Sequence, residues 1–197
     1  NDSALKTSLT GHFEYGTEKP LHRFLLNIKH ANLAALNFDT DSLSLLQCDV
    51  IANVKGMDPD KISGDINILD LNFKRGNRSI DINELVIKSD QDTYKKTHSI
   101  RSDFFNIDLT GHYKLTTLSP AVSKLVSQYA PQIRWDTSTN VAPETEFRLD
   151  INMLNIQPLV DLFIPDIAVS NNTNFTASYN KSENLMLIES ESEKVEL

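Results

Sequence analysis

The segment FNIDLTGHYKL, residues 105–115, alternates apolar and polar side chains along its whole length. Successive side chains of a β-strand point to opposite faces, so Phe105, Ile107 and Leu109 would share one face and Asn106 and Asp108 the other. One apolar face and one polar face are typical of strands in an antiparallel sheet. This segment therefore predicts a half-buried strand.

The same alternation recurs along the chain. It covers residues 46–54 and 147–153, and a further run in which Phe24, Leu26, Ile28 and His30 share a phase. Residues 62–73 and 80–87 change phase midway, which predicts a β-bulge or a strand kink. The segments KRGNR, residues 74–78, and NKSEN, residues 180–184, have the composition of hairpin turns. The pattern predicts a mainly β fold of about eight to ten antiparallel strands.

Two segments have helical spacing instead. Ser119-Pro120 is a helix start signal, and apolar residues at helical spacing follow it from Val122 to Tyr129. Leu159, Leu162 and Phe163 would share one face of a second helix. The polar run from residue 136 to 146 is expected to be a long loop. Two short amphipathic helices are thus available to cover the sheet.

A weak internal repeat relates LTGHF, residues 9–13, to LTGHY, residues 109–113. We interpret the chain as one elongated β module, residues 1–197, with repeat units of about 1–117 and 118–197. Repeats of β units favour an architecture in which neighbours bury each other's faces. Because the sequence starts at Asn1 without Met, we expect it to be an excerpt of a longer chain.

Composition excludes several functions. With 19 basic and 27 acidic residues and a net charge of -8, the chain lacks the basic footprint of a nucleic-acid binder. Its single cysteine, Cys48, excludes an intrachain disulfide and a multi-cysteine zinc site. Cys48 lies in the apolar phase of its segment, so we expect a buried, inert thiol. No catalytic motif or zinc-binding histidine motif occurs, and we predict no catalytic residues, no metal site, no cofactor and no enzymatic activity.

The apolar face of the strands is the candidate site. It could close as a β-sandwich core, or remain an open trough for acyl chains or an apolar polypeptide. The residues predicted to line such a trough are Ile66, Ile68, Leu85, Ile87, Phe105, Ile107, Leu109, Phe147, Leu149, Ile151 and Met153.

Four segments, residues 28–37, 62–71, 100–131 and 156–163, together resemble the C-terminal repeats of the TamB-like translocation and assembly proteins. These belong to the AsmA-like, bridge-like lipid-transfer group, and the order of the segments is similar to the Bacteroidetes branch. The resemblance implies an elongated, curved, taco-like β groove lined with apolar residues. It also implies a long periplasmic protein that an N-terminal anchor holds in the inner membrane.

The resemblance further implies a function in the cell envelope. The groove would carry phospholipid or another acyl-chain ligand toward the outer membrane, or assist outer-membrane protein assembly with a barrel partner of the Omp85 family. The alternative is a closed β-sandwich that acts as a binding or adhesion module without lipid cargo. An outer-membrane barrel is a weaker alternative, because the aromatic residues, 8% of the chain, are scattered.

Overall fold

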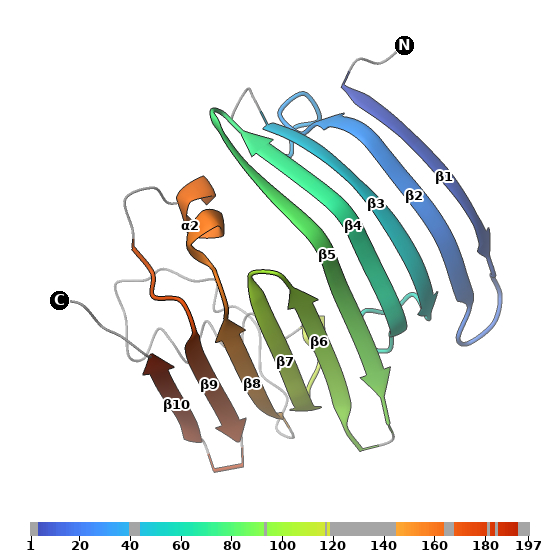
Figure 1. The fold of residues 1–197 in the computed structure, drawn as a ribbon. Helices are drawn as coiled ribbons and strands as arrows, with labels where there is room; N and C mark the ends of the chain where they lie inside the picture. The colour runs from blue at the N-terminus through green and yellow to red at the C-terminus, as the bar shows by residue number, and fades with distance from the viewer. Residues whose placement is uncertain are drawn as a thin grey trace.

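The computed structural model describes residues 4–39, 44–92, 94–116, 118, 145–163, 168–180, 182–183 and 185–192. These residues form ten strands and one helix, α2 (Figure 1). The strands are β1 (Leu5–Phe13), β2 (Leu21–Asn32), β3 (Ser44–Lys55), β4 (Ser63–Arg75), β5 (Arg78–Gln91), β6 (Lys96–Ser102), β7 (Phe105–His112), β8 (Glu146–Met153), β9 (Thr173–Asn180) and β10 (Leu185–Ser192). The helix α2 spans Gln157–Phe163.

All ten strands belong to one antiparallel sheet, in the order of the chain from β1 to β10. Each strand from β2 to β9 pairs with the strand before it and the strand after it, as the turn signals predicted. Among the described residues, β1 and β10 each pair with one neighbour and form the two edges of an open sheet. The mainly β, antiparallel fold predicted from the sequence is therefore confirmed.

The predicted phase change in residues 62–73 and 80–87 is confirmed. Gln47 pairs with Asn72 and Asp49 pairs with Leu69, so β4 contributes one residue more than β3 at this point. Asp70 lies there with φ +49°, a conformation that few non-glycine residues adopt. The register between β4 and β5 stays constant, so the two strands change phase together.

A second irregularity on β2 corrects the sequence pattern. Lys6 pairs with His30 and Thr7 pairs with Ile28, so β2 has one extra residue here. A one-residue shift moves every later side chain to the other face. His30 therefore does not share the face of Phe24, and Ala31, 3% exposed, takes that place.

The predicted turns and one predicted helix are also present. The β4–β5 hairpin turns within residues 74–78, where Gly76 has φ +59°, and the β9–β10 turn lies within residues 180–184. The helix α2 agrees with the second predicted helix. The first predicted helix, residues 122–129, lies outside the described residues, as does the predicted loop up to residue 144.

The sheet has a step between β5 and β6. The strands β2–β5 contain 12–14 residues, whereas β6–β10 contain 7 or 8. Pairing of β5 with β6 begins only at Leu85. Just before it, the Asp103 carboxylate accepts hydrogen bonds from the backbone and side-chain nitrogens of Asn83, both at 3.1 Å. The Asp103 side chain, from the turn between β6 and β7, thus bonds β5 at the place where a longer β6 would pair with it.

Glycines stand at equivalent places in the two copies of the LTGH motif. Gly11 pairs with Phe24 on the next strand, and Gly111 pairs with Phe147. A Cβ atom at Gly11 would lie 2.4 Å from a backbone oxygen, and one at Gly111 would lie 2.3 Å from the Glu146 oxygen. In both copies, the backbone at the glycine therefore lies so close to the paired strand that a Cβ atom has no room.

Within the described part of the chain, two clusters of buried side chains form the core. One joins Ile80, Ile82 and Phe104 to Leu162 of α2. The other joins Leu109, Tyr113, Phe147 and Tyr179 at the opposite end of the shorter strands. Both clusters include residues of the predicted apolar face, so that face is also the side on which the chain packs.

Candidate binding face

Register places apolar side chains in continuous rows across the sheet. Residues directly opposite each other on paired strands point to the same face. One such row crosses eight strands from β2 to β9 and consists of Phe24, Ala52, Ile66, Ile87, Ile100, Ile107, Ile151 and Phe175. We call the face that carries this row the apolar face.

All eleven predicted lining residues lie on the apolar face. Ile68 pairs with Leu85, and Leu109 pairs with Leu149. Phe105 pairs with Met153, and Phe147 lies beside Leu149 at the position two residues earlier on β8. The register therefore places these residues on one face, and their role as the lining of a groove stays a prediction.

The sequence prediction missed other members of this face. Phe24 and Ala52 lie in alternating runs outside the predicted set, and the register of β2, β3 and β4 places them in the same row. Ile100 was missed because its strand, KTHSIRS, has only one large aliphatic residue. The alternation of His98, Ile100 and Ser102 would have been the signal for β6.

The middle of the apolar face belongs to neither buried cluster. Leu109 and Phe147 are buried, and the other nine predicted residues are partly exposed. The six that lie in neither cluster are Ile66, Ile68, Ile87, Ile107, Ile151 and Met153. These side chains offer apolar surface that the described residues cover only in part.

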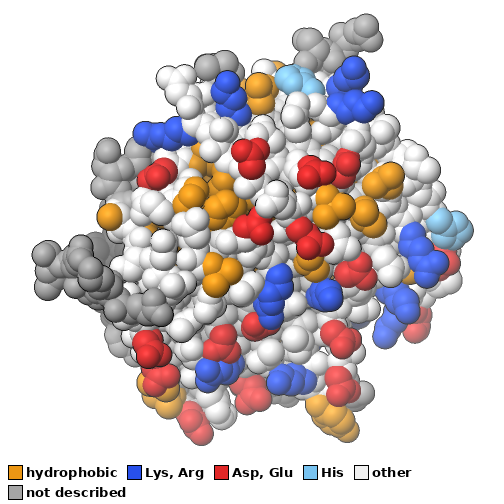
Figure 2. Space-filling model, viewed as in Figure 1, with side chains coloured by type: hydrophobic (Ala, Val, Ile, Leu, Met, Phe, Trp, Pro, Cys, Tyr) orange, Lys and Arg blue, Asp and Glu red, His pale blue; other side chains and the backbone are white. Residues whose placement is uncertain are grey.

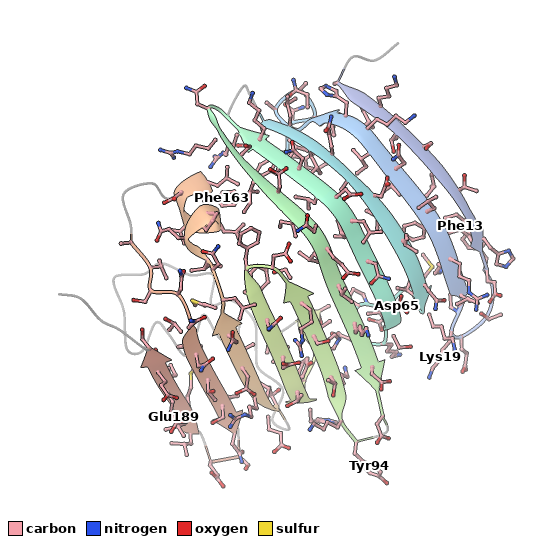
Figure 3. The ribbon with its side chains drawn as sticks, in the orientation of Figure 1. Phe13, Lys19, Asp65, Tyr94, Phe163 and Glu189 are labelled. Atoms are coloured by element: carbon pink, nitrogen blue, oxygen red, sulfur yellow. The ribbon has the colours of Figure 1, made fainter. Side chains whose placement is uncertain are left out.

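The helix α2 covers one end of the apolar face, where β5 extends past β6. Leu162 is 4% exposed and packs against Ile80 and Ile82. Phe163, labelled in Figure 3, stacks on Phe73 with ring centroids 6.1 Å apart, and the Arg75 guanidinium lies 5.6 Å from the Phe163 ring. A cation over an aromatic face adds attraction to this packing.

A polar cluster borders the other end. Tyr113 Oη donates to the Leu109 carbonyl oxygen at 3.2 Å and also contacts His98 Nδ1. Tyr113 Oη and His98 Nδ1 are thus hydrogen-bond partners, and His98 Nε2 is buried with no partner among the described residues. Lys96 donates to the Asp60 carbonyl oxygen at 2.7 Å and lies 6.0 Å from the Tyr113 ring. A buried, unpartnered Nε2 and the nearby Lys96 charge fit a neutral His98 imidazole.

Stability is expected to decrease as His98 is titrated. Burial, and secondly the Lys96 charge, lower the pKa of His98 below 6.5. The unfolded chain takes up a proton near pH 6.5 and the folded chain only at lower pH, so this contribution to stability is complete above pH 6.5 and lost as the pH falls through the folded-state pKa. Urea midpoints at pH 7.5 and 5.5 should therefore differ less for His98→Gln than for the unmodified chain. His12→Gln, at an exposed position, is the control; equal pH dependence with and without His98 would contradict the assignment.

Cys48 agrees with its prediction as a buried thiol. It is 7% exposed on β3, in phase with Val50 and Ala52. Burial, and secondly the charge of Asp49, raise the pKa of the thiol above its ordinary value of 9.0. A thiol that resists ionisation is a poor nucleophile.

The opposite face carries charged side chains in exposed pairs. Arg101 contacts Asp108 at 2.6 Å, and Arg148 contacts Asp150 at 2.8 Å. Hydrogen bonds from Arg148 lower the pKa of Asp150. Figure 2 shows acidic and basic side chains interspersed over the side in view, with hydrophobic side chains in separate patches. Such exposed pairs each contribute little to stability.

Among the described residues, no three His, Cys, Asp or Glu side chains come together as metal ligands, and no helix is long and apolar enough to cross a membrane. Two hollows of about 460 and 350 Å³ lie at the ends of β7–β10, one beside Arg148 and Tyr179 and one beside Asn152 and Glu191. Neither is lined by any of the six partly exposed residues in the middle of the apolar face.

Comparisons with known proteins do not assign the chain to a family. No family model, no curated protein and no solved structure matches it. A function is therefore inferred from the apolar face and the sequence resemblance.

Proposed function

We propose that the apolar face binds the acyl chains of phospholipid, within a segment of a TamB-like periplasmic protein. In this proposal the sheet forms a curved, taco-like groove, and phospholipid moves along it toward the outer membrane. An anchor elsewhere in the protein would hold it in the inner membrane, and an outer-membrane protein of the Omp85 family would be its partner. The segment itself would have no enzymatic activity.

The observation that carries the proposal is the apolar row from β2 to β9. Seven strand spacings make this row about 34 Å long, whereas one acyl chain spans about 15 Å in half of a bilayer core. Every methylene that leaves water for such a surface contributes about 0.8 kcal/mol. Many similar, shallow contacts favour binding without fixing the lipid at one place.

The alternative of a closed β-sandwich receives less support. A sandwich needs two sheets whose inner faces pack together. The described residues form one sheet, with α2 packed on one end of its apolar face and Leu115 and Leu118 packed at the other. The lipid experiment separates these two functions, because a closed module would take up no phospholipid.

The test replaces a central side chain of the row. Ile107 lies between Ile100 on β6 and Ile151 on β8, so Ile107→Asp places a carboxylate among aliphatic groups. Loss of contact with two methylenes, about 1.6 kcal/mol, would weaken lipid binding about tenfold. The measurement is the uptake of a fluorescent phospholipid by delipidated protein, and Leu149→Asp should act similarly.

Ile51→Asp is the matched control. Ile51 is 42% exposed on the opposite face of β3, so the same change of chemistry there should leave lipid uptake unaltered. Circular dichroism and thermal unfolding establish that each variant is folded, and Ile107→Thr is a milder second variant. Undiminished uptake by a folded Ile107 or Leu149 variant would show that the apolar face does not bind the lipid.

A further inference from the structure

Both edge strands expose large apolar side chains. On β1, Leu9 is 56% exposed, and on β10, Leu187 is 52% and Ile188 is 48% exposed. Leu5, Phe13 and Leu185 are exposed as well. The edges thus combine main-chain groups on their outer sides with apolar side chains, which favours the addition of a further strand.

The edges lack two of the features that usually prevent strand addition. Neither β1 nor β10 contains proline, and neither has a register shift in its own strand that would twist the edge away. Glu14 donates its backbone N–H to the Leu21 oxygen at 3.0 Å. Because N–H directions alternate along a strand, even-numbered residues of β1 face β2, and the N–H of Leu9 faces outward.

Strand number makes the two edges compatible with each other. With ten antiparallel strands, β10 runs opposite to β1. A second copy in the same orientation can therefore place its β1 antiparallel to this β10, and the apolar faces of both copies then lie on the same side. The pairing continues the sheet without any change of its geometry.

Charge favours this pairing over pairing of like edges. The strand β1 carries Lys6 and His12 and no acidic residue, whereas β10 carries Glu189 and Glu191 and no basic residue. Figure 3 labels Phe13 and Glu189 at opposite edges of the sheet. Two β10 strands side by side would bring carboxylates together, which opposes association.

We propose that β1 of one copy of this chain pairs with β10 of a second copy, so that copies associate head to tail. The contact is heterologous, and the assembly is open, with one free β1 edge and one free β10 edge at its ends. The interaction is independent of lipid and of the proposed transport function.

The test blocks each edge separately. Leu9→Glu places a carboxylate on β1, which opposes the acidic residues of β10, and Ile188→Lys places a cation on β10, which opposes Lys6 and His12 of β1. Sedimentation velocity between about 1 μM and about 1 mM covers the range of weak specific contacts. The unmodified chain should show masses that increase with concentration, each variant alone should remain monomeric, and an equimolar mixture of the two should associate.

Leu25→Lys is the matched control, because Leu25 is 48% exposed on β2 but does not lie at an edge. It should associate like the unmodified chain. Leu9→Pro is a second blocking variant, since it removes only an outward N–H of β1. The proposal is overturned if the unmodified chain is monomeric throughout, if either blocked variant associates alone, if the mixture remains monomeric, or if Leu25→Lys abolishes association.

Discussion

Gly111→Ala is expected to lower the melting temperature of the chain by roughly 10 °C. Gly111 has φ +145°, a conformation that L side chains rarely adopt, which costs about 1–3 kcal/mol. The new Cβ would also lie 2.3 Å from the Glu146 oxygen and 2.7 Å from the Phe147 Cα, so the β7–β8 pair must separate. A total of about 3 kcal/mol or more corresponds to this shift for a chain of this size.

Gly16→Ala is the control for the conformational part of this cost. Gly16 also has a positive φ, +80°, but a Cβ there meets nothing within 4 Å. It should cost about 1 kcal/mol, from backbone strain alone. Thermal unfolding by circular dichroism measures both variants; equal effects would mean that the close approach at Gly111 has no energetic importance.

Leu162→Ala is expected to destabilise the chain by about 3 kcal/mol and to release α2 from the sheet. Leu162 is 4% exposed among Ile80, Ile82 and Phe104, and deletion of a buried leucine side chain costs about 2–5 kcal/mol. A helix of seven residues has little stability by itself, so its packing holds it in place. Hydrogen exchange of the α2 amides and thermal unfolding together measure the effect.

The matched control on the same helix is Asp161→Ala. Asp161 is exposed and accepts a hydrogen bond from Gln157 one turn earlier, a pair that contributes about 0.5 kcal/mol or less. Its replacement should leave amide exchange in α2 nearly unchanged. If Leu162→Ala also left exchange unchanged, α2 would be held by contacts other than the Leu162 side chain.

The strand pattern could be predicted from sequence because each long strand has one solvated face. The phase change in residues 62–73 was visible because Ile68 and Leu69, on successive positions, are both large and apolar. The register shift on β2 was not visible in the sequence, because Lys29 and His30 are both polar and do not show which of them points to the apolar face. The strand β6 was missed because His98 and Ser102 occupy positions where aliphatic residues would be expected.

The sequence predicts which residues lie on the candidate face, but not which of them other segments of the chain cover. Period-two alternation selects the residues of a face, and constant register then joins Ile66 to Ile87 and Ile107 to Ile151 across strands. Which part of that face is covered depends on contacts between distant segments, such as Leu162 with Ile80. No local pattern encodes the Asp103–Asn83 hydrogen bonds that end the β5–β6 pairing.

The step between β5 and β6 gives the sheet a taper and hence a direction. At about 3.3 Å per residue, β4 is about 43 Å long and β9 about 26 Å, so the surface narrows from one half to the other. A hydrocarbon chain lying across the strands would encounter the same row spacing throughout, whereas one lying along them would have less room on the β6–β10 half. Copies joined edge to edge would repeat this taper, and the resulting ribbon would have distinguishable ends.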